Sequence, residues 1–310
     1  MSFTAEVKDE LARVAPVCSH CERATLAALV RIEGTLFVSG QSHYRIEIST
    51  DVGSIARLAI RLMHELYGLK TVPTVRRSVL HKTPNYLIEV PSQPALADAL
   101  LDMGVLSPSG GLEMGIKPSL IKKQCCTAAY VRGVFLGSGF SSDPKGDFHF
   151  EITVESLQLA QDIKQILEAK GIRARVIQRR NSYVVYLKSG SSIVEFLAFT
   201  GAHHSALDLE NQRVIKSLRN DANRITNAEV ANQAKTATAA VSQIFAIRKV
   251  IEHYGLDALS PGLQEFIRLR VKHPEASLKE LGEFANPPLS KSAVYHRVRR
   301  IEEMAAQVKE

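Results

Sequence analysis

One order of apolar and polar positions occurs twice along the chain. An alternating segment at 44–50 precedes apolar residues at helical spacing over 55–66, and the same order returns at 148–154 and 159–167. Alternation predicts a half-buried strand, whereas apolar residues three or four positions apart predict a helix with one buried face. The chain therefore contains an internal duplication.

Each copy opens with a helical block rich in alanine and glycine, Cys21–Gly34 in the first and Cys126–Gly139 in the second. Later in each copy come two further strands and a short helix that ends near Gly104 or Gly201. The order helix, strands, helix, strands, helix predicts an α+β fold with two pseudo-symmetric halves. Because small residues let helices approach closely, we expect the two opening helices to pack against each other.

The duplication ends near residue 206, and helical patterns follow. Asn220–Asn223 is a polar stretch typical of a linker, and Thr226–Glu229 has the pattern of a capping box that begins a helix. Gly255 ends that helix, and Ser260 with Pro261 predicts the start of the next, with serine capping its free amides. The buried faces expected for these two helices contain Val230, Ala237, Val241, Ile244 and Ile251, and Leu263, Phe266, Ile267 and Val271. We therefore expect a domain at 1–205 with repeats at about 20–105 and 125–203, a linker at 206–222, and an all-helical domain at 223–310.

The last part of the chain has the pattern of a helix-turn-helix motif at about 277–309. Ser277–Glu280 is a capping box that begins a short helix, with Leu278, Leu281 and Phe284 turned inward. The prolines of Ala285–Pro288 end it, since proline removes a donor and disfavours helical geometry before it. A second, basic helix begins at Leu289–Ser290.

Helical projection separates this second helix into two faces. Val294, Val298 and Ile301 form the inner stripe, and the polar residues suit a DNA major groove. The candidate DNA-binding residues are Lys291, Ser292, Tyr295, His296, Arg297, Arg299 and Arg300. The alternative is a solvated cationic helix end that complements the helix dipole, which explains Arg299 and Arg300 poorly because several helical residues follow them.

Two arginine pairs on predicted strands are secondary candidates for DNA contact. Arg76 and Arg77 lie in the first copy, and Arg179 and Arg180 in the second. A twisted sheet can present such cations to a duplex backbone, but edge strands also use cations to prevent pairing between sheets. Both interpretations remain open from the sequence.

Composition limits the class of protein. The 310 residues carry a net charge of +7, which fits a polyanionic partner without requiring one. No apolar run approaches the roughly 20 residues that span a bilayer, and the amino terminus lacks the basic and apolar regions of a signal peptide. We expect a cytoplasmic protein without a membrane partner.

Several motifs resemble those of the WhiA family of regulators from Gram-positive bacteria, and the resemblance covers nearly the whole chain. They are Tyr130–Gly139 with Ser142–Pro144; Asn223-Arg224, Ala231-Asn232 and Lys235-Thr236; and Ser277–Leu281, Ser290–Ser292 and His296-Arg297. The resemblance implies two repeats of the LAGLIDADG homing-endonuclease fold, followed by a helix-turn-helix similar to region 4 of sigma factors.

The same resemblance implies a function. It implies a sequence-specific DNA-binding transcriptional regulator tied to cell division and chromosome segregation, and to sporulation in filamentous relatives. Its partner would be double-stranded DNA, with RNA polymerase or another regulator as a candidate protein partner, and its location the cytoplasmic nucleoid. The alternatives are an active metal-dependent DNA endonuclease and a non-enzymatic interaction scaffold.

The nuclease motif of the family aligns with Leu26–Gly34 in the first copy and Val131–Gly139 in the second. The resemblance implies that an active member has an acid before the final glycine of each copy, because the two carboxylates hold divalent metal. Here these positions are Glu33 and Ser138. Serine is a poor ligand for Mg²⁺, so we expect no catalytic residues and no enzyme activity.

The four cysteines allow two interpretations. If the opening helices pair at their like ends, Cys18, Cys21, Cys125 and Cys126 converge together with His20, and such a group has the chemistry for zinc. Against this, adjacent cysteines do not easily ligate one tetrahedral ion, and buried thiols fill small gaps well. From the sequence we expect no metal and no cofactor.

Overall fold

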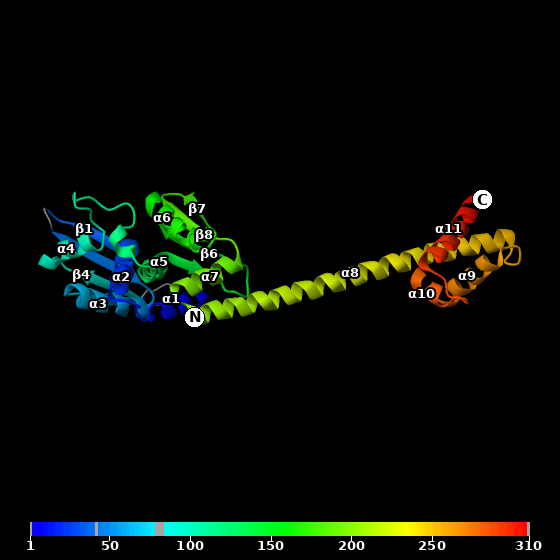
Figure 1. The fold of residues 1–310 in the computed structure, drawn as a ribbon, viewed down its shortest axis with the longest axis horizontal. Coiled ribbons are helices and arrows are strands. Elements are labelled where there is room, and N and C mark those ends of the chain that lie inside the picture. The colour runs from blue at the N-terminus through cyan, green and yellow to red at the C-terminus, as the bar shows by residue number, and fades with distance from the viewer. Residues whose placement is uncertain (1, 41–42, 78–83, 309–310) are drawn as a thin grey trace. The chain divides into compact units, whose positions relative to one another are not determined.

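The computed structural model describes residues 2–40, 43–77 and 84–308 (Figure 1). The chain divides into two compact units, Met1–Lys216 and Ser217–Glu310, which we describe separately.

The first repeat contains helices and one antiparallel sheet. Its elements are α1 (Phe3–Leu11), α2 (Ser19–Glu33), β1 (Gly34–Val38), β2 (Tyr44–Thr50), α3 (Gly53–Tyr67), β3 (Val72–Arg77), β4 (Pro84–Val90) and α4 (Pro94–Asp102). The strand order is β1-β2-β4-β3, with every neighbouring pair antiparallel. Ile46 and Ile48 of β2 are buried and alternate with more exposed residues, as a sheet with one face on the core requires.

The second repeat has the same element order and topology. Its elements are a 3-10 helix η1 (Pro118–Ile121), α5 (Gln124–Ser138), β5 (Gly139–Ser141), β6 (Phe150–Val154), α6 (Leu157–Glu168), β7 (Ala174–Arg179), β8 (Ser182–Leu187) and α7 (Gly190–Thr200). The strand order β5-β6-β8-β7 matches that of the first sheet. The predicted duplication and the α+β fold class are confirmed.

Helices α2 and α5 pack directly against each other at the centre of this unit, as predicted. The hydroxyl of Thr25 on α2 donates to the carbonyl oxygen of Ala129 on α5 at 3.1 Å. A Cβ atom at Gly133 would collide with the backbone of Thr25 and with the side chain of Ala28. The glycines of α5 therefore permit a separation that larger residues would prevent.

Helix α1 was not predicted. Ser2 caps it by accepting from the amide of Ala5, and Val7 and Leu11 are buried on one face. The spacing of Phe3, Val7 and Leu11 was the available signal, since residues four apart share a helix face. Thr4 of α1 exchanges hydrogen bonds of 2.6 and 2.9 Å with the backbone of Ser141, so α1 covers part of the edge strand β5.

The predicted interruption of the helix at 220–226 is wrong, although the division between the two units, after Lys216, falls within residues 206–222. Residues 206–222, expected to form a linker, and Thr226, expected to begin a helix, all lie inside α8 (His203–Tyr254). No glycine or proline occurs between Gly201 and Gly255, so nothing ends the helix, and a few residues of modest helix propensity do not interrupt it.

The unit from Ser217 onward is all helical. Beyond α8 it contains α9 (Pro261–Lys272), α10 (Leu278–Glu283) and α11 (Lys291–Gln307). The core consists chiefly of Ile247, Val250, Phe266, Ile267, Leu281, Val294, Val298 and Ile301. The predicted capping box of Ser277 and Glu280 is confirmed.

Some apolar positions of this unit differ from the prediction. Val230, Val241 and Val271 are more than half exposed. Phe284 is half exposed and contacts His273 with the rings tilted and their centroids 4.5 Å apart. Arg270 is buried instead, and its guanidinium donates to the carbonyl oxygen of Ala276 at 2.6 Å. The side chain of Ser260 does not cap α9. Helical spacing identifies a stripe, but the neighbouring helices decide which edge of it is covered.

Replacement of Gly133 by alanine tests the close contact of α2 and α5. Helix propensity alone predicts that alanine stabilises by about 1 kcal/mol. Because the new methyl group collides with Thr25 and Ala28, we expect a loss of about 1–3 kcal/mol in the free energy of unfolding instead. Urea unfolding followed by circular dichroism measures the difference. The control is Gly111→Ala, where the methyl group meets no atom closer than 3.8 Å. Stabilisation by Gly133→Ala would contradict the prediction.

Candidate nucleic-acid interface

The turn between α10 and α11 is held by backbone contacts. The amide of Leu289 donates to the carbonyl oxygen of Gly282 at 2.8 Å. A Cβ atom at residue 282 would collide with the carbonyl oxygen of Leu289, so this approach requires glycine. Ser290 then caps α11 by accepting from the amide of Ala293 at 3.2 Å. These contacts fix the direction in which α11 leaves the turn.

Helix α11 has one buried and one exposed face, as the projection predicts. Val294, Val298 and Ile301 are at most 4% exposed. Six of the seven candidate DNA-binding residues are exposed: Lys291, Ser292, Tyr295, His296, Arg299 and Arg300. The structure therefore brings these six side chains together on the surface of one helix.

Arg297 is placed differently from the other six candidates. Its Nη1 atom lies 2.9 Å from Oε2 of Glu265 on α9, and both side chains are largely covered. The same carboxylate accepts from the amide of Asn286 in the turn at 3.1 Å. The guanidinium of Arg297 and then the Asn286 amide lower the pKa of Glu265, so the pair is charged at neutral pH. Arg297 thus connects α9, the turn and α11.

Arg299 and Arg300 keep their charge exposed. Both lie near Glu303, at 3.3 and 3.7 Å, and their side chains are 65% and 63% exposed. Exposed pairs of this kind contribute little to stability and exchange readily with other partners. The two guanidinium groups therefore remain accessible to an anionic ligand.

A shallow groove of about 300 Å³ lies beside the start of α11. Lysines from three helices line it: Lys235 of α8, Lys279 of α10 and Lys291 of α11, all exposed. Sequence reasoning missed Lys235 and Lys279 as contact candidates, because three separate helices bring these cations together. Lysine is a point charge suited to phosphate.

The outer face of the first sheet is close to neutral. Arg45 of β2 lies 2.7 Å from Glu47 and 3.4 Å from Glu89, and its guanidinium stacks on the ring of Phe37. Arg76 is exposed near the end of β3. Arg77 pairs with Pro84 through the backbone, and its side chain lies outside the described residues.

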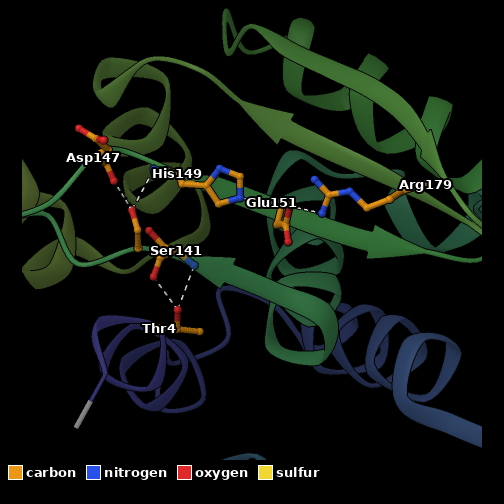
Figure 2. A network of polar contacts seen from close by, with 7 residues as sticks. Thr4, Ser141, Asp147, His149, Glu151 and Arg179 are labelled. Carbon is orange, nitrogen blue, oxygen red and sulfur yellow. Dashed lines mark hydrogen bonds and ion pairs between the residues drawn. The ribbon is translucent and has the colours of Figure 1, made fainter.

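The outer face of the second sheet carries more positive charge. Arg175, Arg179 and Lys188 are exposed there, and Glu151 is the acidic residue among them. Figure 2 shows Glu151 between His149 and Arg179, each 3.2 Å from its Oε2 atom. One carboxylate therefore offsets part of a larger positive charge, and this face suits phosphate better than that of the first sheet.

Arg180 lies at the tip of the hairpin between β7 and β8. Its φ angle is 55°, a left-handed conformation that residues with a Cβ atom rarely adopt, and its side chain is exposed. Of the arginines predicted as secondary contacts, Arg76 thus lies on the nearly neutral sheet face and Arg179 on the more basic one, with Arg180 at the tip of the adjoining hairpin.

The positions that correspond to the nuclease acids are adjacent to a lysine. Nζ of Lys8 on α1 donates to the carbonyl oxygen of Gly137 at 2.7 Å, next to Ser138 at the end of α5. Burial lowers the pKa of Lys8, and the charges of Glu33 and then Asp51 oppose that shift. Burial likewise raises the pKa of Glu33, against the effect of Lys8. The charges of Lys8 and Glu33 therefore act on each other at the position where a nuclease would hold metal.

No metal-binding group forms at this position in the described ranges. Within these ranges, Glu33 is not part of any group of three or more histidine, cysteine or acidic side chains that could share an ion, although the charge of Asp51 acts on it. Ser138 is half-buried, and its hydroxyl has no hydrogen-bond partner among the described residues. Sequence reasoning identified the missing acid but missed Lys8, because α1 itself was missed.

Among all the residues that the structure describes, no helix has both the length and the apolarity needed to cross a membrane.

Three family models match consecutive parts of the chain. They are the WhiA N-terminal LAGLIDADG-like domain over residues 19–106, the WhiA LAGLIDADG-like domain over 127–219 and the WhiA C-terminal HTH domain over 222–305. Two relatives, each called a probable cell division protein WhiA, match over almost their whole length. That of Heliobacterium modesticaldum is 42% identical over 98% of this chain and 96% of its own, and that of Desulforudis audaxviator is 40% identical over 99% and 98%.

Solved structures support the same fold. The full-length DUF199/WhiA protein of Thermotoga maritima has a TM-score of 0.61 and 24% identity, with all of both chains covered. The N-terminal LAGLIDADG domain of DUF199/WhiA has a TM-score of 0.51 over 64% of this chain and 90% of its own, at 22% identity. From the domain models and the curated relatives, this chain belongs to the WhiA family.

Proposed function

We propose that this protein is a sequence-specific DNA-binding transcriptional regulator that acts in cell division and chromosome segregation. The exposed face of α11 is the observation that carries the proposal. This face presents six polar and cationic side chains to solvent, while the opposite face of the helix packs into the core. The curated relatives support the cellular role, since each is called a probable cell division protein. The protein acts at the nucleoid, in contact with RNA polymerase or another regulator.

Sequence recognition belongs to the exposed face of α11. Arginine can donate two hydrogen bonds to the edge of guanine, and histidine and tyrosine can bond to bases or phosphates. The lysines that line the groove beside α11 hold the backbone of the same duplex, which sets the register of the base contacts. In this arrangement Arg297 acts through its ion pair with Glu265 and positions α11.

The LAGLIDADG-like repeats assist binding but do not cleave DNA. Arg76, Arg77, Arg179 and Arg180 are the secondary contacts, and those of the second sheet are the stronger because that face is more basic. Cleavage is absent because Ser138 replaces one metal-binding acid and Lys8 offsets the charge of the remaining acid, Glu33. Ser138 contributes no charge and Lys8 counters that of Glu33, so less negative charge is available to bind Mg²⁺ than in a site with two unopposed acids.

Alanine substitutions on α11 test base recognition. Operators would be selected from a random-sequence pool with the full-length protein, and affinities measured by gel shift. We expect His296→Ala and Arg299→Ala each to weaken operator binding roughly tenfold, as loss of a base contact does, and to reduce discrimination against unrelated DNA. Arg268→Ala, which removes an exposed arginine from α9, is the control and should have little effect. Unchanged affinity in both α11 variants would rule out this helix as the reader.

A double-mutant cycle tests whether Arg297 positions α11 or contacts DNA. If it positions the helix, Arg297→Ala and Glu265→Ala should weaken operator binding by similar, severalfold factors, and the double variant should be little worse than either. Both should also lower the melting temperature. A direct contact predicts the opposite for Glu265→Ala, because removal of a negative charge near DNA would leave affinity unchanged or improve it.

Incubation of supercoiled plasmid with Mg²⁺ or Mn²⁺ tests the absence of cleavage. We expect the plasmid to stay intact at protein concentrations that shift it fully on a gel. Any nicking should persist in Glu33→Ala, which would identify a contaminating nuclease. Nicking that disappears in Glu33→Ala would show an active site and overturn this part of the proposal.

The salt dependence of DNA affinity distinguishes the regulator from an interaction scaffold. Binding that does not fall steeply with added salt would favour a scaffold without phosphate contacts.

A further inference from the structure

Four cysteines meet at the amino-terminal ends of α2 and α5, and Glu33 and Ser138 lie at the opposite ends of these helices. Cys18 is the N-cap residue of α2 and Cys21 lies in its first turn, while Cys125 and Cys126 lie in the first turn of α5. Because the two helices pair at their like ends, residues more than a hundred positions apart in sequence come into contact.

The sulfur atoms have the spacing of ligands around one ion. Sγ of Cys18 lies 3.5 Å from that of Cys21 and 3.6 Å from those of Cys125 and Cys126, and all four lie within 4.8 Å of one another. Zinc–sulfur bonds of about 2.3 Å in a tetrahedron place sulfurs about 3.8 Å apart. The sulfur of a disulfide lies about 2.0 Å from its partner, and all four cysteines are free thiols.

We propose that Cys18, Cys21, Cys125 and Cys126 bind one Zn²⁺ ion as a structural site that fastens the two repeats together. This reverses the expectation from the sequence that adjacent cysteines do not share an ion. The distances answer that objection directly, because the sulfurs of both Cys125 and Cys126 lie 3.6 Å from that of Cys18. With four protein ligands the coordination shell is closed, which is typical of structural rather than catalytic zinc.

The surroundings suit a thiolate site. The four cysteines lie at the N-cap or in the first turn of two helices, where the positive ends of the helix dipoles stabilise negative charge. On binding, each thiol releases its proton to solvent, and the divalent ion offsets part of the charge of the four thiolates.

Zinc fits this group better than an iron–sulfur cluster does. A cluster contains several metal ions and separates its thiolate ligands more widely than these sulfurs are separated. A tetrahedron of four sulfurs is the geometry of a single zinc ion, and borderline-soft Zn²⁺ has no geometric preference of its own to oppose it. The site lies within one compact unit and does not depend on where DNA binds.

Metal analysis of the full-length protein tests the site. The protein would be purified without chelators, reductants that bind metal, or a polyhistidine tag. We expect about one zinc per chain by mass spectrometry of the elements, as a single closed tetrahedral site holds one ion. Cys21→Ser and Cys126→Ser should each lose most of it, while His20→Ala should keep it, because the imidazole of this neighbouring residue is not part of the group.

Two further measurements hold even if the serine variants misfold. Cobalt added to the wild-type apo-protein should give the intense visible absorption of tetrahedral Co²⁺ with thiolate ligands, and zinc should abolish it. Removal of zinc by a strong chelator should lower the melting temperature of the wild-type protein, and added zinc should restore it. Absence of zinc together with two intact disulfides, a stoichiometric iron content, or zinc retained when all four cysteines are serine would each overturn the proposal.

Discussion

The contact between α2 and α5 is the interaction on which the rest of the repeat unit depends. Each helix belongs to a different copy of the duplicated sequence, and the two copies meet where Gly133 lies against Thr25. The hydroxyl of Thr25 bonds to the backbone of α5, and at Gly133 the approach leaves no room for a Cβ atom. Both sheets follow their opening helices, so the close approach of these helices determines where the two sheets lie in this unit.

The two ends of this helix pair have different chemistry. At the carboxyl ends, the position of one nuclease acid holds Ser138, and Lys8 from the preceding helix binds beside it. The ammonium group of Lys8 bonds to a helix carbonyl, and its charge counters part of the rise that burial causes in the pKa of Glu33. At the amino ends, four thiols lie at the distances that one ion would impose, and the proposed zinc would hold together what the small residues already bring close.

In the helical unit, a small number of contacts positions α11. Gly282 lets the turn approach α10, Ser290 caps the new helix, and the Glu265 carboxylate bonds both to the turn and to Arg297. These contacts involve the backbone, the Ser290 hydroxyl and one ion pair. None of them uses the exposed side chains on the outer face of α11. A helix whose exposed side chains are not needed for folding can present them to DNA.

The sequence by itself determined the duplication, the strands and most helices, and the two faces of α11. These follow from local periodicity and from capping residues, which act within a few positions along the chain. It also located the substitution of Ser138 for an acid, because the two copies align. Only the tertiary structure decided that α8 continues through Asn220–Asn223, that Arg297 pairs with Glu265, and that Lys8 binds beside Ser138. The contact of Cys18 with Cys125 and Cys126 is likewise visible only in the tertiary structure. Contacts between residues far apart in sequence depend on how helices pack, and they produce no periodic pattern of apolar and polar residues.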